Sequence, residues 1–332
     1  MEMISIKDWQ QSANHDALAK RINMALRFTV AKYQQQTPQQ QEQEEQELIK
    51  ILADSPIALP MERFLNRHFS WPYAMWEKII GRDLFYSSGL WQRDDETPQQ
   101  AAQNMMRCIC QRAELNNAKS VLDFNGLCGG LSAYIIKHYP HIKLTTVIST
   151  PSQQIMLETL KHTMEAPEWT IVLAKDPFQW KDNQQYDRIL AIDILDCVRN
   201  FKRLLSYFSS SLSARGLLFA QLTTFASGSY LVEDDSTGGG FTHHGTQVSD
   251  KFLYHFQEEL LVRRHWTMTG LHFMKTLQAW QQCLNDHCKQ SPGETEIIER
   301  QLYFFFLSQL YGCNQGDCWR ISHYLWCKNE NK

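Results

Sequence analysis

Two carboxylates follow one predicted buried strand, 186–192, and both are candidates for acid–base chemistry. Asp193 and Asp196 come directly after this strand, at the end where an open α/β sheet binds its ligands. Carboxylates placed there can orient a substrate amine or accept a proton from it. Capping of the next helix is an equally good role for the same two acids, so both interpretations stay open.

A glycine-rich turn follows an earlier predicted strand, 120–124. It reads Asn-Gly-Leu-Cys-Gly-Gly over 125–130 and leads into a helix at 131–139. Such a turn lets the backbone approach a nucleotide and offers free amide groups at the helix start. Tight turns also need glycine for conformational reasons alone, so the turn by itself leaves nucleotide binding open. Asp176, just after a third strand, is either a ligand contact or a solvated loop acid.

The elements that must position these residues alternate between strand and helix. The expected strands are 120–124, 143–148, 170–174, 186–192 and 216–222, separated by helices at 131–139, after Pro151 and at 201–212. This alternation predicts an α/β fold with a doubly wound parallel sheet.

Helical additions are expected on both sides of this core. A helix at 5–35 precedes a Gln/Glu-rich run that is either a linker or, as we prefer, a helix capped by Thr37 and begun by Pro38. After 223 we expect a loop at 227–245, a helix at 250–258, a strand at 259–266, helices at 272–289 and 294–311, and a strand at 320–326. The predicted units are a helical cap (1–84), a Rossmann-like core (85–225), and a lid loop with a helical insertion over the carboxyl end of the sheet (226–332).

Composition excludes several classes of protein. The net charge is −3 and no Lys/Arg block stands out, so neither nucleic acid nor an anionic membrane is an expected partner. No signal peptide or membrane-spanning stretch is apparent, and we expect a cytoplasmic protein. The nine cysteines are irregularly spaced and lack the paired C-x-x-C pattern of zinc sites. We therefore expect reduced thiols and no metal.

Several scattered segments, in matching order and spacing, resemble one known family. They are 86–91 (YSSGLW), 97–115, 121–134, 186–189 (YDRI), 216–219 (GLLF), 270–273 (GLHF), 310–316 (LYGCNQG) and 319–325 (WRISHYL). Together they resemble the cyclopropane-fatty-acid-synthase superfamily of S-adenosylmethionine (SAM) methyltransferases, and within it the coclaurine N-methyltransferase group. The resemblance spans nearly the whole chain and implies SAM as cofactor and a small molecule, an amine, as methyl acceptor.

Carried over by position, the resemblance implies three sets of site residues. Contacts to SAM fall on Tyr86, Ser87, Asp123, Asn125, Gly126, Gly129, Gln153, Asp176 and Asp193. Substrate contacts fall on Trp91, Phe241, His272, Phe273 and Trp326, although core packing is the alternative for each aromatic taken singly. The catalytic candidates are Asp193, Asp196, Cys197 and His244.

The chain departs from the family pattern in the glycine turn and in the catalytic stretch. Asn125 and Leu127 replace two glycines of the turn, and Leu127 puts a branched side chain where the backbone should face the cofactor. Cys197 replaces the histidine that serves as base or substrate partner, and a neutral thiol is no substitute unless its pKa is lowered. His243 and His244 are possible replacements, or else solvated loop residues.

The lipid-modifying members of the superfamily bind bicarbonate through a Cys, a Glu, a His and a Tyr. The matching residues here are Ser88, Asp196, Gln221 and Phe273, which argues against cyclopropane synthesis. We expect a SAM-dependent N-methyltransferase, and a homodimer is one assembly that the sequence leaves open. The alternative is a non-catalytic binding or scaffold protein whose Leu127 and Cys197 record lost chemistry, because a fold alone does not determine function.

Overall fold

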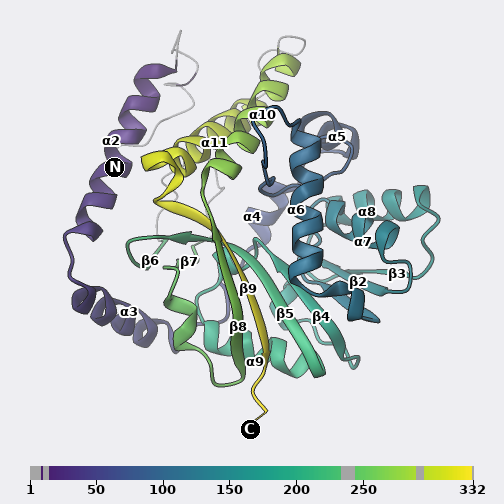
Figure 1. Ribbon diagram of the computed structural model, residues 1–332. Coiled ribbons are helices and arrows are strands. Elements are labelled where there is room, and N and C mark those ends of the chain that lie inside the picture. Colours follow the sequence, from purple (N-terminus) through teal and green to yellow (C-terminus); the bar gives the residue numbers. More distant parts are fainter. Residues whose placement is uncertain (1–8, 10–14, 233–243, 289–294, 331–332) are drawn as a thin grey trace.

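The computed structural model describes Trp9 and residues 15–232, 244–288 and 295–330 (Figure 1). A seven-stranded sheet runs through the molecule in the order β3-β2-β1-β4-β5-β9-β8. Its strands are β1 (Ser120–Asp123), β2 (Lys143–Ile148), β3 (Trp169–Leu173), β4 (Tyr186–Ile192), β5 (Leu212–Phe225), β8 (Leu260–Met268) and β9 (Trp319–Lys328). The predicted α/β class is confirmed, and so is each of its expected strands to within a few residues.

The sheet is parallel from β3 to β5 only. β9 pairs antiparallel with β5, and β8 pairs antiparallel with β9. The five alternating strands predicted to be parallel are therefore parallel, and β9 and β8 add an antiparallel edge. The reason is connectivity: α10 (Leu271–Cys288) and α11 (Thr295–Gly312) lie between β8 and β9 and return the chain to the carboxyl end of the sheet, from which β9 must run back.

Three helices begin with the same Thr-Pro-x-Gln pattern. They are α3 (Pro38–Leu52), α6 (Pro98–Arg112) and α8 (Pro151–Thr163), capped by Thr37, Thr97 and Thr150. In each, the threonine hydroxyl accepts from the backbone N–H three residues on, and the glutamine there accepts from the threonine N–H. Two otherwise unpaired donors are satisfied at each start, which confirms that 38–52 is a helix and not a linker.

The remaining helices cover the sheet and extend beyond its ends. α7 (Gly130–His138) and α9 (Phe201–Ser211) complete the alternating core, and α2 (Asp16–Gln34), α4 (Glu62–His68) and α5 (Tyr73–Ile80) belong to the N-terminal part. Buried residues of α2 and α3, such as Leu26 and Leu48, join the same apolar cluster as the sheet. None of the helices in the described ranges is long and apolar enough to cross a bilayer.

The prediction of a helix at 250–258 was wrong. Only one 3₁₀ turn forms, η4 (Phe252–His255), because Phe252 and Leu253 are fully buried and the chain then leads directly into edge strand β8.

A short strand pair brackets most of the loop expected at 227–245: β6 (Tyr230–Leu231) pairs with β7 (Thr246–Gln247). Residues 233–243, with Phe241 and His243, lie outside the described ranges.

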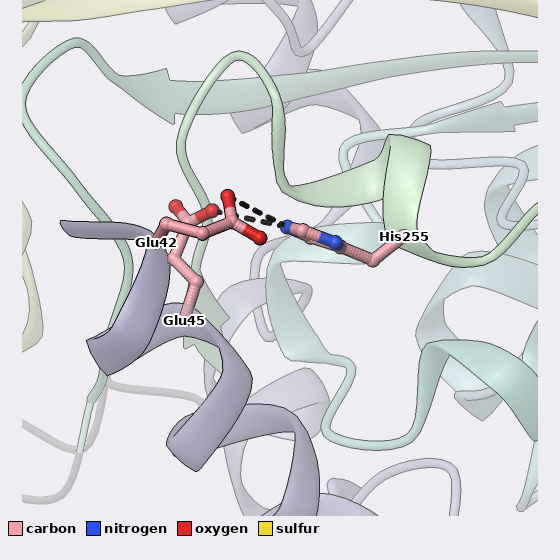
Figure 2. Close-up of side chains that lie close together, drawn as sticks. All are labelled: Glu42, Glu45 and His255. Atoms are coloured by element: carbon pink, nitrogen blue, oxygen red, sulfur yellow. Dashed lines mark hydrogen bonds and ion pairs between the residues drawn. The ribbon is translucent and has the colours of Figure 1, made fainter. Parts of the chain in front are cut away.

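An ion-pair cluster joins α3 to η4 (Figure 2). Nε2 of His255 lies 3.4 Å from Glu45 and 4.0 Å from Glu42, while the other carboxylate oxygen of Glu45 accepts from Ser229 at 2.6 Å. Glu45 is buried although it lies on a helix rich in exposed Gln and Glu. The cluster attaches the N-terminal part to the segment that leads into β8.

Candidate active site

A cavity of about 190 Å³ lies at the carboxyl ends of the parallel strands, between them and α4, α10 and α11. Figure 1 shows α10 and α11 together at this end of the sheet. The lining comes from segments that are distant in sequence: Phe64, Leu65, His68 and Phe69; Tyr86; Asn125 and Leu127; Asp193, Ile194, Asp196 and Cys197; Thr223; Gln247; Phe273, Leu277 and Trp280; and Tyr303, Phe304, Leu307, Leu310 and Tyr311. The helical insertion thus does cover the carboxyl end, as predicted.

Asp193 lines this cavity immediately after β4. Its Oδ2 accepts from the Ser87 hydroxyl and its Oδ1 accepts from Gln221 Nε2 at 3.1 Å. Its backbone is left-handed (φ 54°), a conformation that aspartate tolerates better than most residues. Burial raises the pKa of Asp193 to about 6, while the bonds from Ser87 and Gln221 act in the opposite direction. The carboxylate is thus held in one orientation toward the cavity.

Asp196 and Cys197 face the same cavity from the 3₁₀ turn η3 (Leu195–Cys197). Burial raises the pKa of Asp196 to about 8, and the neighbouring charge of Asp193 adds to this. A carboxyl group with such a pKa can exchange a proton near neutral pH. Burial and the same two acids raise the pKa of the Cys197 thiol well above its usual value, so Cys197 is a neutral thiol and a poor base.

The turn after β1 keeps the backbone shape of a glycine turn without all of its glycines. Gly126 (φ 62°), Leu127 (φ 45°) and Gly129 (φ 88°) all have left-handed backbones. A side chain at Gly126 would meet Ile148 at 2.6 Å, which explains why glycine stays there. Asp123 closes the turn by accepting from Gly126 N at 3.4 Å and from Ser132 at 2.6 Å, and burial raises its pKa to about 6.

Leu127 lines two hollows. It contributes to the main cavity and to a recess of about 10 Å³ that is also bordered by Tyr86, Asp123, Gly126 and Gly130. Leu127 therefore borders both the cavity that holds Asp193 and Asp196 and the recess at the start of α7. Asn125 lines the main cavity, while its side-chain amide donates to the Ile192 carbonyl at 3.0 Å.

Tyr86 borders both hollows and belongs to a cluster that the sequence did not reveal. Its hydroxyl accepts from Arg300 at 3.2 Å and lies 3.4 Å from Nδ1 of His68. Its ring stacks on Trp280, with ring centres 5.3 Å apart. Arg300 is fully buried on α11 and lies against the rings of Trp71 and Trp76. Nothing in the local pattern of 60–82 distinguished His68 from the core aromatics around it.

Other predicted site residues are engaged by the chain itself. Gln153 is fully buried and bonds the backbone of the turns after β1 and β2. The carboxylate of Asp176 caps a 3₁₀ turn by accepting from Phe178 N at 3.0 Å and from Gln179 at 2.7 Å. The His244 carbonyl accepts from Arg199, and the described cavity lining does not include this residue.

Of the predicted substrate contacts, the structure brings Phe273 to the cavity. His272 instead accepts from the Trp91 backbone N–H at 3.2 Å, and the Trp91 indole donates to Thr276 at 3.0 Å. Trp326 is fully buried on β9 and packs on Tyr324. Among the described residues, the one group of three possible metal ligands is Glu42, Glu45 and His255 (Figure 2), which lies outside the cavity lining.

The sheet order and the glycine turn at the carboxyl end of β1 place the chain in the class of Rossmann-like, nucleotide-binding α/β proteins. Residues 60–317 match the model of the mycolic acid cyclopropane synthetase family, and the chain belongs to this family.

Individual relatives make the relationship more specific. (S)-Coclaurine N-methyltransferase of Thalictrum flavum subsp. glaucum is 26% identical over 300 residues, 85% of this chain and 83% of that enzyme. Cyclopropane-fatty-acyl-phospholipid synthase of Escherichia coli K12 is 25% identical over 218 residues, 65% of this chain and 54% of that enzyme.

A solved structure of coclaurine N-methyltransferase bound to N-methylheliamine and SAH superposes with a TM-score of 0.88 at 25% identity, covering 97% of this chain and 98% of that one. A cyclopropane synthase of Mycobacterium tuberculosis has the same fold, with a TM-score of 0.69 at 15% identity over 81% of this chain and 99% of that one. Family and solved relatives identify the chain as an enzyme of the SAM-dependent methyltransferase class.

Proposed function

We propose that the chain transfers a methyl group from SAM to a nitrogen atom of a small, partly aromatic amine held in the cavity. The observation that carries this proposal is the composition of the lining: Asp193 and Asp196 are its acids, and most of the remainder is aromatic or aliphatic. A protonated amine is attracted by carboxylates and by the faces of aromatic rings. N-methylation by the coclaurine N-methyltransferase named above supports the same substrate class.

The residues of the glycine turn fit the methyl donor. Tyr86 and Leu127 border hollows on both sides of the turn, and Asp193 and Ser87 present a fixed polar edge beside it. We assign SAM contacts to Tyr86, Asp123, Asn125, Gly126 and Asp193. When bound, SAM supplies an electrophilic methyl group, which the amine lone pair takes while the carbon–sulfur electron pair stays on sulfur.

Asp196 is assigned as the proton acceptor. An ammonium group has no lone pair, so a base must first remove its proton. Asp196 has a pKa of about 8 because of burial, and an ammonium group beside it favours its ionised form. The proton therefore passes from the nitrogen to the Asp196 carboxylate. Phe273, Trp280 and Tyr311 keep water away from the nitrogen and shield its positive charge.

The test combines binding and turnover. SAH is titrated into the protein by calorimetry, and methyl transfer from labelled SAM is measured with a panel of primary, secondary and tertiary alkylamines that carry an aromatic ring. We expect binding of SAH and labelling of at least one amine, with the label lost in Asp196→Asn. Labelling of an unsaturated lipid, or SAH binding with every amine inert, would contradict the proposal.

The non-catalytic alternative makes a different prediction for the same assays. If the chain is a binding or scaffold protein with a blocked turn, calorimetry detects no SAH binding in the wild type, and binding appears when Leu127 is replaced by glycine.

A further inference from the structure

A chain of hydrogen bonds crosses the sheet from Arg112, at the end of α6, to Asp193 at the cavity. Arg112 Nη1 lies 2.9 Å from Nδ1 of His323, and Nε2 of His323 lies 2.8 Å from Oε1 of Gln221. Gln221 Nε2 donates to Asp193 at 3.1 Å and to the Ser87 hydroxyl at 2.6 Å. Two residues outside the cavity lining, Arg112 and His323, are thereby connected to the acid after β4.

The directions of these bonds follow from the chemistry of the partners. A guanidinium group only donates, so Nδ1 of His323 must accept. The other ring nitrogen then carries the hydrogen and donates to Oε1 of Gln221. Because Oε1 of Gln221 accepts the hydrogen bond from His323, the amide can direct only its nitrogen toward Asp193. The chain therefore determines which end of this amide faces the acid.

The sheet holds these groups in line. His323 on β9 and Gln221 on β5 are directly paired residues, and Gln221 is in turn paired with Ile192, next to Asp193. Side chains of paired residues in a sheet lie on the same face. His323 is fully buried and packs edge-on against Phe219, with ring centres 4.9 Å apart. Arg112 lies over the Trp266 ring at 4.8 Å, which restricts the guanidinium.

We propose that Arg112 and His323 are positioning residues that fix the Gln221 amide and so keep Asp193 a carboxylate with both oxygens accepting hydrogen bonds. The inference rests on the proposed function where it gives Asp193 a role in SAM binding. The tautomer of His323 and the orientation of the Gln221 amide do not depend on that function.

Other groups near the two ends of the chain are part of the electrostatics. Asp193 is faced by Asp196, Cys197, Tyr86 and Tyr311, which are acidic or neutral at physiological pH. In the described ranges, its side-chain donors are Ser87 and Gln221. His323 is faced by Arg112 and His265, and both, with burial, lower the pKa of its ring. The ring is therefore neutral, and replacing it removes no charge.

The experiment compares two pairs of variants in the full chain. His323→Leu removes the donor to Gln221, whereas His323→Gln keeps an N–H at the same reach. Arg112→Met removes the donor to His323 but keeps an apolar stem on Trp266, whereas Arg112→Lys keeps a donor. Thermal unfolding of each variant shows whether it is folded, and the Arg112 pair changes a partly exposed position whereas the His323 pair changes a fully buried one.

The first readout needs no ligand. Nitrogen NMR of the wild-type His323 ring should show one neutral tautomer with the hydrogen on Nε2, and carboxyl NMR should give the pKa of Asp193. We expect His323→Leu to raise the pKa of Asp193 by about one pH unit, because the amide can then turn its oxygen to the acid. Arg112→Met should act in the same direction, and both conservative variants should match the wild type.

The second readout is SAH affinity against pH. A pKa raised by about one pH unit from near 6 implies about fivefold weaker binding at pH 6 in His323→Leu and little change at pH 8.5. A wild-type His323 with the hydrogen on Nδ1, or an unchanged pKa of Asp193 in both disruptive variants, would overturn the inference. Absence of SAH binding in the wild type, with the NMR results as expected, would count against the proposed function alone.

Discussion

Gln153 donates a 2.9 Å hydrogen bond to the carbonyl oxygen of Leu127, and Leu127 holds a left-handed backbone at φ 45°. The same amide lies 3.4 Å from the Asn125 carbonyl, and its oxygen accepts from the N–H groups of Ser149 and Thr150. A leucine in this conformation carries a steric cost of about 1 kcal/mol. The fully buried glutamine offsets that cost by tying together the turns after β1 and β2.

Replacing Leu127 by glycine should tighten SAH binding by about threefold to tenfold, because Leu127 borders both hollows and a residue without a side chain leaves more room there. The free energy of unfolding should change by less than about 1 kcal/mol, since relief of backbone strain is offset by the greater freedom of glycine in the unfolded chain. Calorimetric titration measures the first and urea unfolding the second. Leu127→Ala, which keeps the strained backbone, should also tighten binding; weaker binding in both variants would show that the side chain supports the ligand.

Replacing Gln153 by methionine should lower the free energy of unfolding by about 2 kcal/mol and weaken SAH binding, because several buried backbone groups lose their partner. The matched control is Gln100→Met, which removes the same capping glutamine from α6 on the exposed side. It should cost about 1 kcal/mol and leave SAH binding intact. Equal effects of the two variants on binding would refute a role for Gln153 in holding the turn.

The rate of methyl transfer should rise with pH through the titration of Asp196. In the free protein its pKa is about 8, so the apparent kcat/KM is expected to increase until about that pH and then level off. Asp196→Asn should remove this limb and lower kcat by about a hundredfold or more. A full pH profile with a neutral and a basic amine separates this effect from titration of the substrate itself.

Asp196 should also make the ligand-free protein less stable at alkaline pH. Its folded-state pKa is raised from 3.8 to about 8, so its contribution to stability is greatest below about pH 3.8 and is lost as the pH rises from there to about 8. Relative to wild type, Asp196→Asn should therefore gain about 1 kcal/mol between pH 7 and 8.5. Urea unfolding at the two pH values tests this, and histidine titration cancels because it is common to both proteins. A constant difference between the two proteins would disprove the raised pKa.

Cys197 should be dispensable as a base. Its thiol pKa is well above the usual value because it is buried beside Asp193 and Asp196, so Cys197→Ala should keep methyl transfer within about threefold of wild type. Initial rates with saturating SAM measure this. Loss of activity in Cys197→Ala together with full activity in Cys197→Ser would point instead to a hydrogen bond made by the thiol.

Local patterns were sufficient for most of the fold. β2 and β4 begin and end at the predicted residues, because each is a short buried run between clear turn signals. The Thr-Pro-x-Gln starts of α3, α6 and α8 could be inferred because a cap is satisfied within four residues. The prediction of a helix at 250–258 was wrong because burial of Phe252 and Leu253 outweighed the local propensity for helix.

The same division holds for the site. Local sequence was enough to predict that acids follow β4 and that a glycine turn follows β1, since strand ends and turns are local features. Long-range packing was needed to show that Trp326 lies in the core, that His272 accepts a hydrogen bond from the Trp91 backbone, and that His68 and Arg300 contact Tyr86. It also decided the connection from Arg112 through His323 to Asp193. The hydrogen bonds among these contacts join residues 18 to 214 positions apart, and no local propensity specifies which distant side chain will lie opposite.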